Sequence, residues 1–455
     1  MSYNIEESSS SSASSDADEG WGGVAEVMGD EEEQKVLFQA LDSFQYVSPV
    51  SQPCLASNSS SAVYILNVNE PYLVDARDML PQYTKIAHYN TTHMRRQSFY
   101  ALPQKHWELL AAPPFSYLDT LNAVDDAIDK NGELAAAILQ SGLESFESSM
   151  DFDKLKSSQL WKGVAKSGDL DKARSTIRQF YRDWSAEGAV ERKACYGPVM
   201  NDLKAERVKR GGKTMNVLVP GAGLGRLVFD LCYEGFNVEG NEMSYHQLLA
   251  SSYILNYCSG SQVHTIFPWV HNFSNHQNRS RQLQSFRIPD IHPGTALHEK
   301  NSVGNGTHKA GEMSMSASDF ICLYNDEEHK DMYDAIATVF FIDTAPNLIR
   351  YIETIKNCLK AGGIWSNIGP LLWHFENNAP GSFGTKDAGK KIVDTSGIAD
   401  PGSIELTNDE VIALVEHFGF KVESKESGIK AGYIQDDESM LQNTYQVSHW
   451  VARKL

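Results

Sequence analysis

The chain has 455 residues, of which 41% are hydrophobic, and its formal net charge at pH 7 is −19. This length favours two structural units, the composition is that of a globular protein, and the negative charge argues against a nucleic-acid partner. We also expect no membrane partner, because the sequence lacks a run of about eighteen apolar residues. No secretory signal is recognisable, and the six cysteines are scattered without a CxxC pair. These features predict a cytoplasmic protein, with the nucleus as the alternative, and no cysteine-based metal site.

Three regions follow one another along the chain. Residues 1–33 are Ser-rich and then acidic, and they are expected to be disordered. Residues 34–210 have a mainly helical pattern, which is clearest from Leu170 to Trp184. One face of that segment is apolar, because its large side chains recur at helical spacing at Ile177, Phe180, Tyr181 and Trp184. Residues 211–455 alternate between short strands and helices.

The alternation in the third region predicts an α/β fold of Rossmann-like type, with a mostly parallel sheet and right-handed crossovers. The last two strands are expected to form an antiparallel pair at the sheet edge. Expected strands are 216–220, 236–240, 334–342, 364–368, 420–423 and 445–451, and expected helices are 226–232, 245–257, one from Pro346 to a stop at 360–363, and 407–417. Two polar insertions, near 274–315 and 378–402, are expected to be long loops.

A glycine-rich turn, Gly221-Ala222-Gly223-Leu224-Gly225, directly follows the first of these strands. Such a turn lets the backbone approach a ligand closely, and the helix that follows favours polar or anionic groups at its N-terminus. Glu242 ends the second strand, where a carboxylate is placed to accept ribose hydroxyls. The third glycine comes one residue earlier than in the dinucleotide fingerprint. This spacing favours S-adenosylmethionine over a nicotinamide cofactor, although an ordinary tight turn stays open.

Asp319 and Phe320 could complete an adenosine pocket, with the carboxylate taking the adenine amino group and the ring covering the base. An N-cap Asp followed by a core Phe explains the same two residues equally well. The sequence alone leaves both interpretations open.

Several longer sequence segments favour one of these cofactors and indicate a protein family. The segments VPGAGLGRLVFDL, GNEMSYHQLLASSYILN, FFIDTAPNLIRYIETIKNCLKAGGIWSNIGPLLWHFEN and SIELTNDEVIALVEHFGF closely resemble the carnosine N-methyltransferase family, and STIRQFYRDWSAEGAVERKACYGPV is similar too. The resemblance covers roughly residues 80–455. It implies a Rossmann-like methyltransferase core after a helical region, and methyl transfer from S-adenosylmethionine to an imidazole nitrogen of carnosine, which gives anserine.

The resemblance also implies roles for individual residues. Gln179, Arg182, Gly221, Gly223, Glu242, Asp319, Phe320 and Val339 match cofactor contacts, and Asp343, His374, Tyr433 and Tyr445 match the substrate site. Gln179 and Arg182 could equally be solvated helix residues, and the tyrosines could simply pack. Tyr433 is the least secure match, because it lies in a stretch that diverges from the family.

Asp343 and His374 are the candidate catalytic residues. Asp343 follows a predicted parallel strand, where open α/β sheets bind their ligands. We expect its carboxylate to accept a hydrogen bond from the protonated ring nitrogen of the substrate, which leaves the other nitrogen's lone pair free to attack. His374 would contact the substrate or carry away a proton. Helix capping by Asp343 and a structural histidine at His374 are the alternatives.

Several functions stay open on the sequence. The expected partner is a small imidazole dipeptide, but a methyltransferase acting on histidine within a protein would need the same side chains. A nicotinamide-dependent oxidoreductase and a non-catalytic interaction protein are the remaining alternatives. The sequence does not determine the oligomeric state, and a homodimer is left open.

Overall fold

The computed structural model describes residues 37, 39–41, 82–145, 167–303, 309–377 and 402–455. The predicted acidic tail, 1–33, and the second polar insertion up to residue 401 therefore lie outside the described residues. Within the described ranges, no helix has the length and apolar character needed to cross a bilayer.

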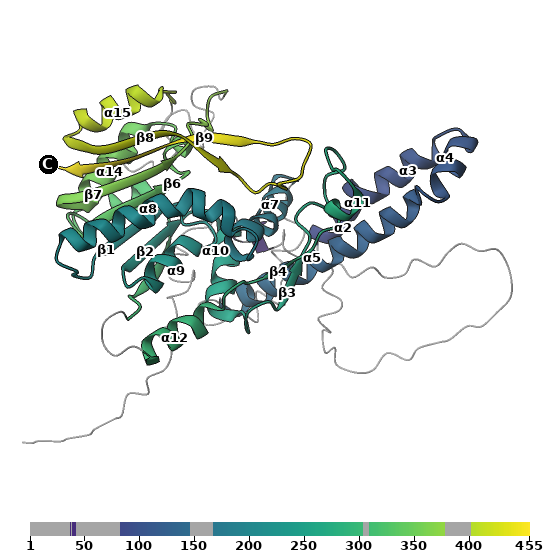
Figure 1. Cartoon of the computed structure of the whole chain (residues 1–455), viewed down its shortest axis with the longest axis horizontal. Coiled ribbons are helices and arrows are strands. Elements are labelled where there is room, and N and C mark those ends of the chain that lie inside the picture. The colour runs from purple at the N-terminus through teal and green to yellow at the C-terminus, as the bar shows by residue number, and fades with distance from the viewer. Residues whose placement is uncertain (1–36, 38, 42–81, 146–166, 304–308, 378–401) are drawn as a thin grey trace, which may run out of the picture.

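A seven-stranded sheet forms one side of the molecule (Figure 1). Its strand order is β5-β2-β1-β6-β7-β9-β8. The strands from β5 to β7 in this order are parallel, and β9 runs antiparallel to both of its neighbours. This confirms the predicted α/β sheet with its antiparallel edge pair. The strand bounds are β1 Asn216–Pro220, β2 Asn237–Glu242, β5 Met313–Ala317, β6 Tyr333–Val339, β7 Leu359–Gly369, β8 Phe420–Gly432 and β9 Thr444–Lys454.

Four helices beside these strands lie close to the predicted positions: α9 Arg226–Tyr233, α10 Tyr245–Ser252 with a π-helical turn Tyr253–Tyr257, α14 Leu348–Cys358 and α15 Asn408–His417. The sequence did not predict α13 Phe320–Tyr324, nor the short 3-10 helix Ile342–Thr344 in place of the end of the expected strand 334–342. The expected helix start at Pro346 is wrong. The Asn347 side chain caps α14 by accepting a hydrogen bond from the Ile349 N–H at 3.2 Å. The expected stop at 360–363 is also wrong, since α14 ends at Cys358 and those residues already belong to β7.

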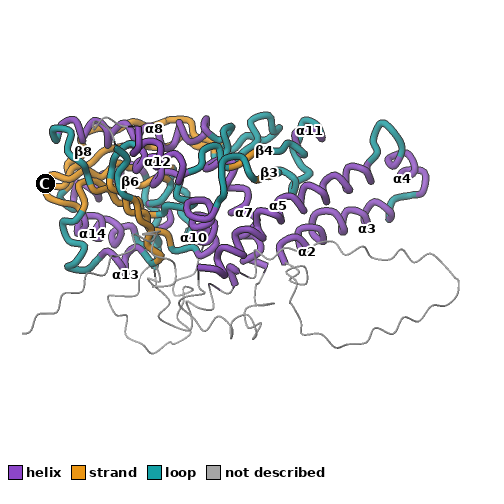
Figure 2. Tube along the Cα trace, turned by 90° about the horizontal axis from the view of Figure 1, so that it is seen from below, coloured by secondary structure: helices purple, strands orange, loops and turns teal. Residues whose placement is uncertain are grey.

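The helical part of the chain precedes the sheet. It contains α2 Gln82–His88, a π-helical turn Tyr89–His93, α3 Met94–Tyr100, α4 Gln104–Ala111, α5 Tyr117–Ser145, α7 Ser167–Trp184 and α8 Ala189–Lys209. Helices α3, α4 and the start of α5 form an arm that extends away from the body (Figure 2). The last helix, α8, instead packs on the sheet, where Val199 and Leu203 are fully buried.

The apolar face predicted on α7 packs into a core shared with the sheet side of the molecule. Phe180 and Trp184 are fully buried, and they belong to one cluster with Leu224 of the glycine turn and Phe229 of α9. The indole N–H of Trp184 also donates to the Leu224 carbonyl at 3.0 Å. Helix α7 is thereby fixed against the glycine turn.

The polar insertion 274–315 is more structured than the sequence indicates. It contains α11 Arg279–Gln282, β4 Phe286–Ile288, α12 Pro293–Val303 and the start of β5. Strand β4 pairs antiparallel with β3 His264–Ile266. The expectation of a long loop is wrong because Phe286 and Ile288, only two residues apart, are both buried in the core against α7.

Candidate active site

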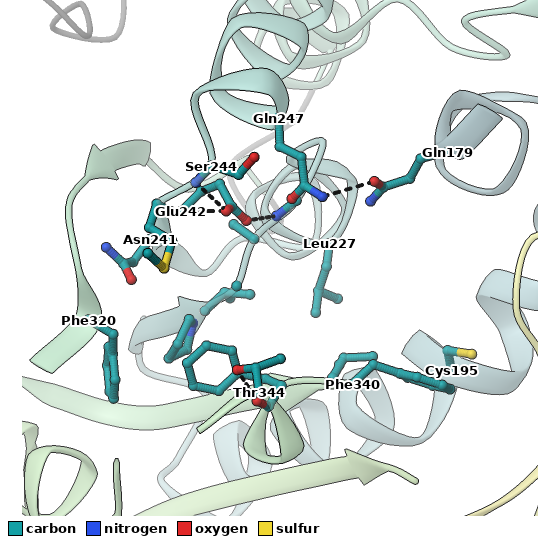
Figure 3. A pocket seen from close by; sticks show the side chains of 18 of the residues that line it. Gln179, Cys195, Leu227, Asn241, Glu242, Ser244, Gln247, Phe320, Phe340 and Thr344 are labelled. Carbon is teal, nitrogen blue, oxygen red and sulfur yellow. Dashed lines mark hydrogen bonds between the residues drawn. The ribbon is translucent and has the colours of Figure 1, made fainter. Parts of the chain in front are cut away.

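A cavity of about 360 Å³ lies where β1 and β6 run side by side. The chain leaves β1 toward β2 and leaves β6 toward β7, so the strand order reverses direction between the two. Open α/β sheets bind their ligands in the crevice at such a switch point, outside the carboxyl ends of the strands. The glycine turn after β1, the end of β2 and the end of β6 all line this cavity, and Figure 3 shows their side chains around it.

The glycine turn has a backbone that other residues would adopt only with strain. Gly221, Gly223 and Gly225 have φ angles of +68°, +59° and +73°. A Cβ atom on Gly221 would lie 2.7 Å from a ring carbon of Phe341. The turn is held against β2 by the Ala222 N–H, which donates to the Asn241 carbonyl at 2.9 Å. Glycine is therefore required here so that backbone can form one wall of the cavity.

Glu242, at the end of β2, is a buried carboxylate with three backbone donors. One oxygen accepts from the Gly223 N–H at 3.0 Å, and the other accepts from Met243 and Ser244 at 2.9 and 2.8 Å. Burial raises the pKa of Glu242, and these backbone hydrogen bonds oppose that rise. A carboxylate offers about four acceptor positions. At least one acceptor position of Glu242 is thus not used by these backbone donors.

Two predicted cofactor residues reach the cavity from α7. Gln179 and Arg182 are 6% and 9% exposed, so the alternative of two solvated helix residues is wrong. The Gln247 amide donates to the Gln179 side-chain oxygen at 3.2 Å, which joins α7 to α10 (Figure 3). The Arg182 guanidinium is held by Asp183, with Nε and Nη2 donating to its two oxygens at 2.7 and 3.0 Å.

Asp183 is a central residue of this site that the sequence did not single out. It is 1% exposed and also accepts hydrogen bonds from the Gln179 amide at 3.1 Å and the Tyr196 hydroxyl at 2.7 Å. Burial alone would raise the pKa of Asp183, but the neighbouring Arg182 charge and the hydrogen bonds outweigh it and hold the pKa below its usual value. An Asp on a polar helix carries no sequence signal that separates it from a surface residue.

Asp319, Phe320 and Val339 line the opposite side of the cavity. Asp319 caps α13 by accepting from the Ile321 and Cys322 N–H groups at 2.8 and 3.1 Å. Phe320 is 4% exposed, and its ring packs edge-on against Phe341 and Tyr351. Asp319 is thus a helix cap and Phe320 a core residue, and both also line the cavity.

The predicted substrate residues divide into two pairs. His374 and Tyr433 line the cavity, whereas Asp343 and Tyr445 are not among the described residues that line it. Asp343 is 3% exposed, and its carboxylate accepts from the Leu372 N–H at 2.9 Å. Its carbonyl accepts from the His374 N–H at 3.2 Å, so Asp343 fixes the segment that carries His374. Burial raises the pKa of Asp343, while the Leu372 bond and nearby His374 oppose the rise.

Phe340, directly after β6, is a second residue that the sequence missed. Its φ of +53° is rare for a bulky residue, and such strain costs roughly 1–3 kcal/mol. Its N–H donates to the Ile368 carbonyl at 2.9 Å, and its ring packs against Tyr433 and Tyr445 at centroid distances of 5.4 and 5.9 Å. Tyr445 therefore supports Phe340, which in turn forms part of the cavity wall with Tyr433.

Comparison with known proteins identifies the family of this chain. A family model described as carnosine N-methyltransferase matches residues 159–455. The carnosine N-methyltransferase of Schizosaccharomyces pombe is 35% identical over 376 residues, which are 82% of this chain and 92% of that protein. The carnosine N-methyltransferase of Mus musculus is 34% identical over 369 residues, which are 81% of this chain and 82% of that protein. This chain belongs to the carnosine N-methyltransferase family.

Proposed function

We propose that the protein is an S-adenosylmethionine-dependent N-methyltransferase that methylates an imidazole nitrogen of carnosine, giving anserine, or of a related histidine-containing dipeptide. Membership of the family supports the reaction and the substrate class. The observation that carries the proposal is the cavity itself, which brings together all eight side chains and glycines predicted to hold the cofactor: Gln179, Arg182, Gly221, Gly223, Glu242, Asp319, Phe320 and Val339.

The residues present fit S-adenosylmethionine. Glu242 would accept the ribose hydroxyls, and the side-chain-free backbone at Gly221 leaves room beside it. Arg182 is a guanidinium held by a neighbouring carboxylate, which suits it to pair with the amino-acid carboxylate of the cofactor. Phe320 and Asp319 would cover and contact the adenine. When bound, the cofactor supplies an electrophilic methyl group on a sulfonium centre.

The protein's own task is then to hold a neutral imidazole in line with that methyl group. Imidazole has an ordinary pKa of about 6.5, so it is largely neutral at physiological pH without a strong general base. Alignment of two reactants can contribute roughly 7–11 kcal/mol at most. His374 and Tyr433, which line the cavity, are proposed to contact the ring, and His374 to receive its proton after transfer.

Asp343 is proposed to fix the ring tautomer, as the sequence predicts, although it does not line the cavity in this structure and its carboxylate also holds Leu372 in place. The substitution Asp343→Asn separates these two contributions, because the Asn side chain can still accept from Leu372 but carries no charge. A fall in kcat of about 100-fold with unchanged S-adenosylhomocysteine binding is expected if the charge acts on the substrate. A loss within a few-fold would limit Asp343 to positioning His374.

The direct test of the function is methylation with labelled S-adenosylmethionine in the presence of carnosine, free histidine or a histidine-containing protein extract. Label should enter carnosine, and mapping of the product should place it on a ring nitrogen. Label in the protein extract alone would reject the dipeptide substrate in favour of a protein. Calorimetric titration with S-adenosylhomocysteine and with NADH checks the cofactor class independently.

A further inference from the structure

A second cavity, of about 450 Å³, lies beside the first. One face of α7, the segment 268–276 and the connection between β8 and β9 line it. In Figure 1 this connection reaches across to α7 and α11, and it is tied there by contacts from Ile434 to Arg178 and from Asp436 to Arg281. Tyr433 lines both cavities, so its ring forms a wall that the two share.

Two arginines and two aspartates line the second cavity: Arg174, Arg178, Asp171 and Asp436. Arg174 pairs with Asp171 at 3.0 Å. Asp436 pairs with Arg281, which lies outside the lining and also contacts Asp437 and Glu438. Arg178 has no carboxylate within ion-pair distance in the part of the chain that the structure describes. Its surroundings lower the pKa of Arg178 by desolvation, against the opposing effect of Glu191. The Arg178 guanidinium therefore lines this cavity without a carboxylate in direct contact among the described residues, and Glu191 opposes its charge only from a distance.

Arg178 is held in a fixed position. Its Nη2 donates to the Ile434 carbonyl, and the guanidinium lies over the Trp269 ring at 5.2 Å from the centroid. Of the five N–H donors on an arginine, the carbonyl contact uses only one. A second titratable group beside it adds no positive charge at neutral pH, because burial lowers the pKa of His271 to about 3. A guanidinium with four further N–H donors has the chemistry to bind a carboxylate at two points.

Residues of helix α7 line both cavities. Arg178 and Arg182 are four residues apart, so they lie on one helix face with their Cβ atoms roughly 5–6 Å apart. Arg182 faces the first cavity and lies over the Tyr433 ring at 5.0 Å, whereas Arg178 faces the second. In a histidine-containing dipeptide with a C-terminal histidine, the carboxylate is only a few bonds from the ring. Such a molecule could place its ring beside Tyr433 and its carboxylate near Arg178.

We propose that the second cavity binds the carboxylate end of the imidazole substrate and that Arg178 is the residue that recognises it. This inference rests on the proposed function. It predicts that the enzyme selects imidazoles with a free carboxylate close to the ring. A histidine inside a protein chain lacks that group, so the same site would discriminate against it.

The test compares carnosine with β-alanylhistamine, which is the same molecule without the carboxylate. The wild-type protein should methylate carnosine with the higher kcat/KM. Arg178→Gln should lower kcat/KM for carnosine by about 10- to 100-fold, mainly through KM, as expected for lost hydrogen bonds to a charged group. Arg178→Gln should change kcat/KM for β-alanylhistamine by no more than about twofold. Lys172→Gln is the matched control, because it removes a cation from an exposed position of the same helix.

The outcomes separate the two proposals. Methylation of neither compound by the wild-type protein would reject the proposed function, and the inference with it. Equal wild-type kcat/KM for the two compounds, or equal losses for both in Arg178→Gln, would overturn the inference and leave the proposed function intact. If Arg178→Gln unfolds in thermal melting, the wild-type comparison still decides, because it requires no substitution.

Discussion

Substitution of Asp183 by Asn should damage both the stability and the cofactor site. The carboxylate is 1% exposed and accepts four hydrogen bonds, two of them from the buried Arg182 guanidinium. Removing one partner of a buried ion pair costs roughly 3–5 kcal/mol, because the other charge is left uncompensated. Asn keeps one acceptor oxygen, so we expect the lower end, about 3 kcal/mol. By size scaling for a chain of this length, this corresponds to a fall in Tm of roughly 3–5 °C.

The same variant should bind S-adenosylhomocysteine about 10-fold more weakly, because Arg182 would no longer be fixed. Calorimetric titration measures the affinity and differential scanning fluorimetry measures Tm. Glu133→Gln is the control, since it removes a carboxylate from an exposed pair with Lys130, where only about 0–1 kcal/mol is at stake. A Tm and an affinity for Asp183→Asn that both match those of the control would refute the assignment of Asp183 as the support of Arg182.

Three further results are expected. Gly223→Ala adds a Cβ atom 3.0 Å from the Gln179 amide at a φ of +59°, so it should weaken S-adenosylhomocysteine binding about 10-fold in titration. Gly211→Ala is the control: its φ is +75°, no atom lies within 4 Å of the added Cβ, and it should lower only Tm. Glu242→Gln turns an acceptor into a donor toward backbone N–H groups and should weaken the same binding by about 10- to 100-fold; unchanged affinity would reject the ribose contact. Burial lowers the pKa of His246 to about 4 in the folded protein, whereas the same side chain in the unfolded chain has a pKa of about 6.5. Between pH 6.5 and 4 the unfolded state therefore binds the proton more readily, and the free energy of unfolding should fall by roughly 2–3 kcal/mol. The urea midpoint of His246→Gln should fall less than that of the wild-type protein between pH 6.5 and 4. An equal fall in both would show that His246 does not cause the loss of stability.

The sheet was predictable because its signals are local. An apolar strand followed by glycines, as at Val217 to Gly225, restricts the backbone wherever it occurs, and helices between such strands then require parallel pairing. Strand β5 was not predicted, because MSMSA buries only two of its side chains and alternates them with serine. Its neighbour β2 supplies the pairing that its own sequence does not indicate.

The site was predictable where a residue acts through its type and its place at a strand end. Glu242 is such a case, since an acidic residue after a second parallel strand has few structural uses. Asp183 and Phe340 were not predictable, because each depends on a tertiary contact. Asp183 faces inward only because α7 packs on the glycine turn, and Phe340 adopts its rare φ only because Gly369 leaves it space.

The shared core between α7 and the glycine turn means that the two parts of the chain are not exchangeable modules. The change of sequence pattern near residue 210 marks a change of secondary structure, yet Phe180 and Trp184 lie in one core with Phe229 beyond it. A fragment beginning at residue 211 would lose Arg182 and expose Leu224 and Phe229 to water. A ligand that contacts both α7 and β2 should therefore stabilise the packing of the helical region against the sheet. Such a ligand should also slow proteolysis of α7, because local unfolding of this helix would then require the ligand to dissociate.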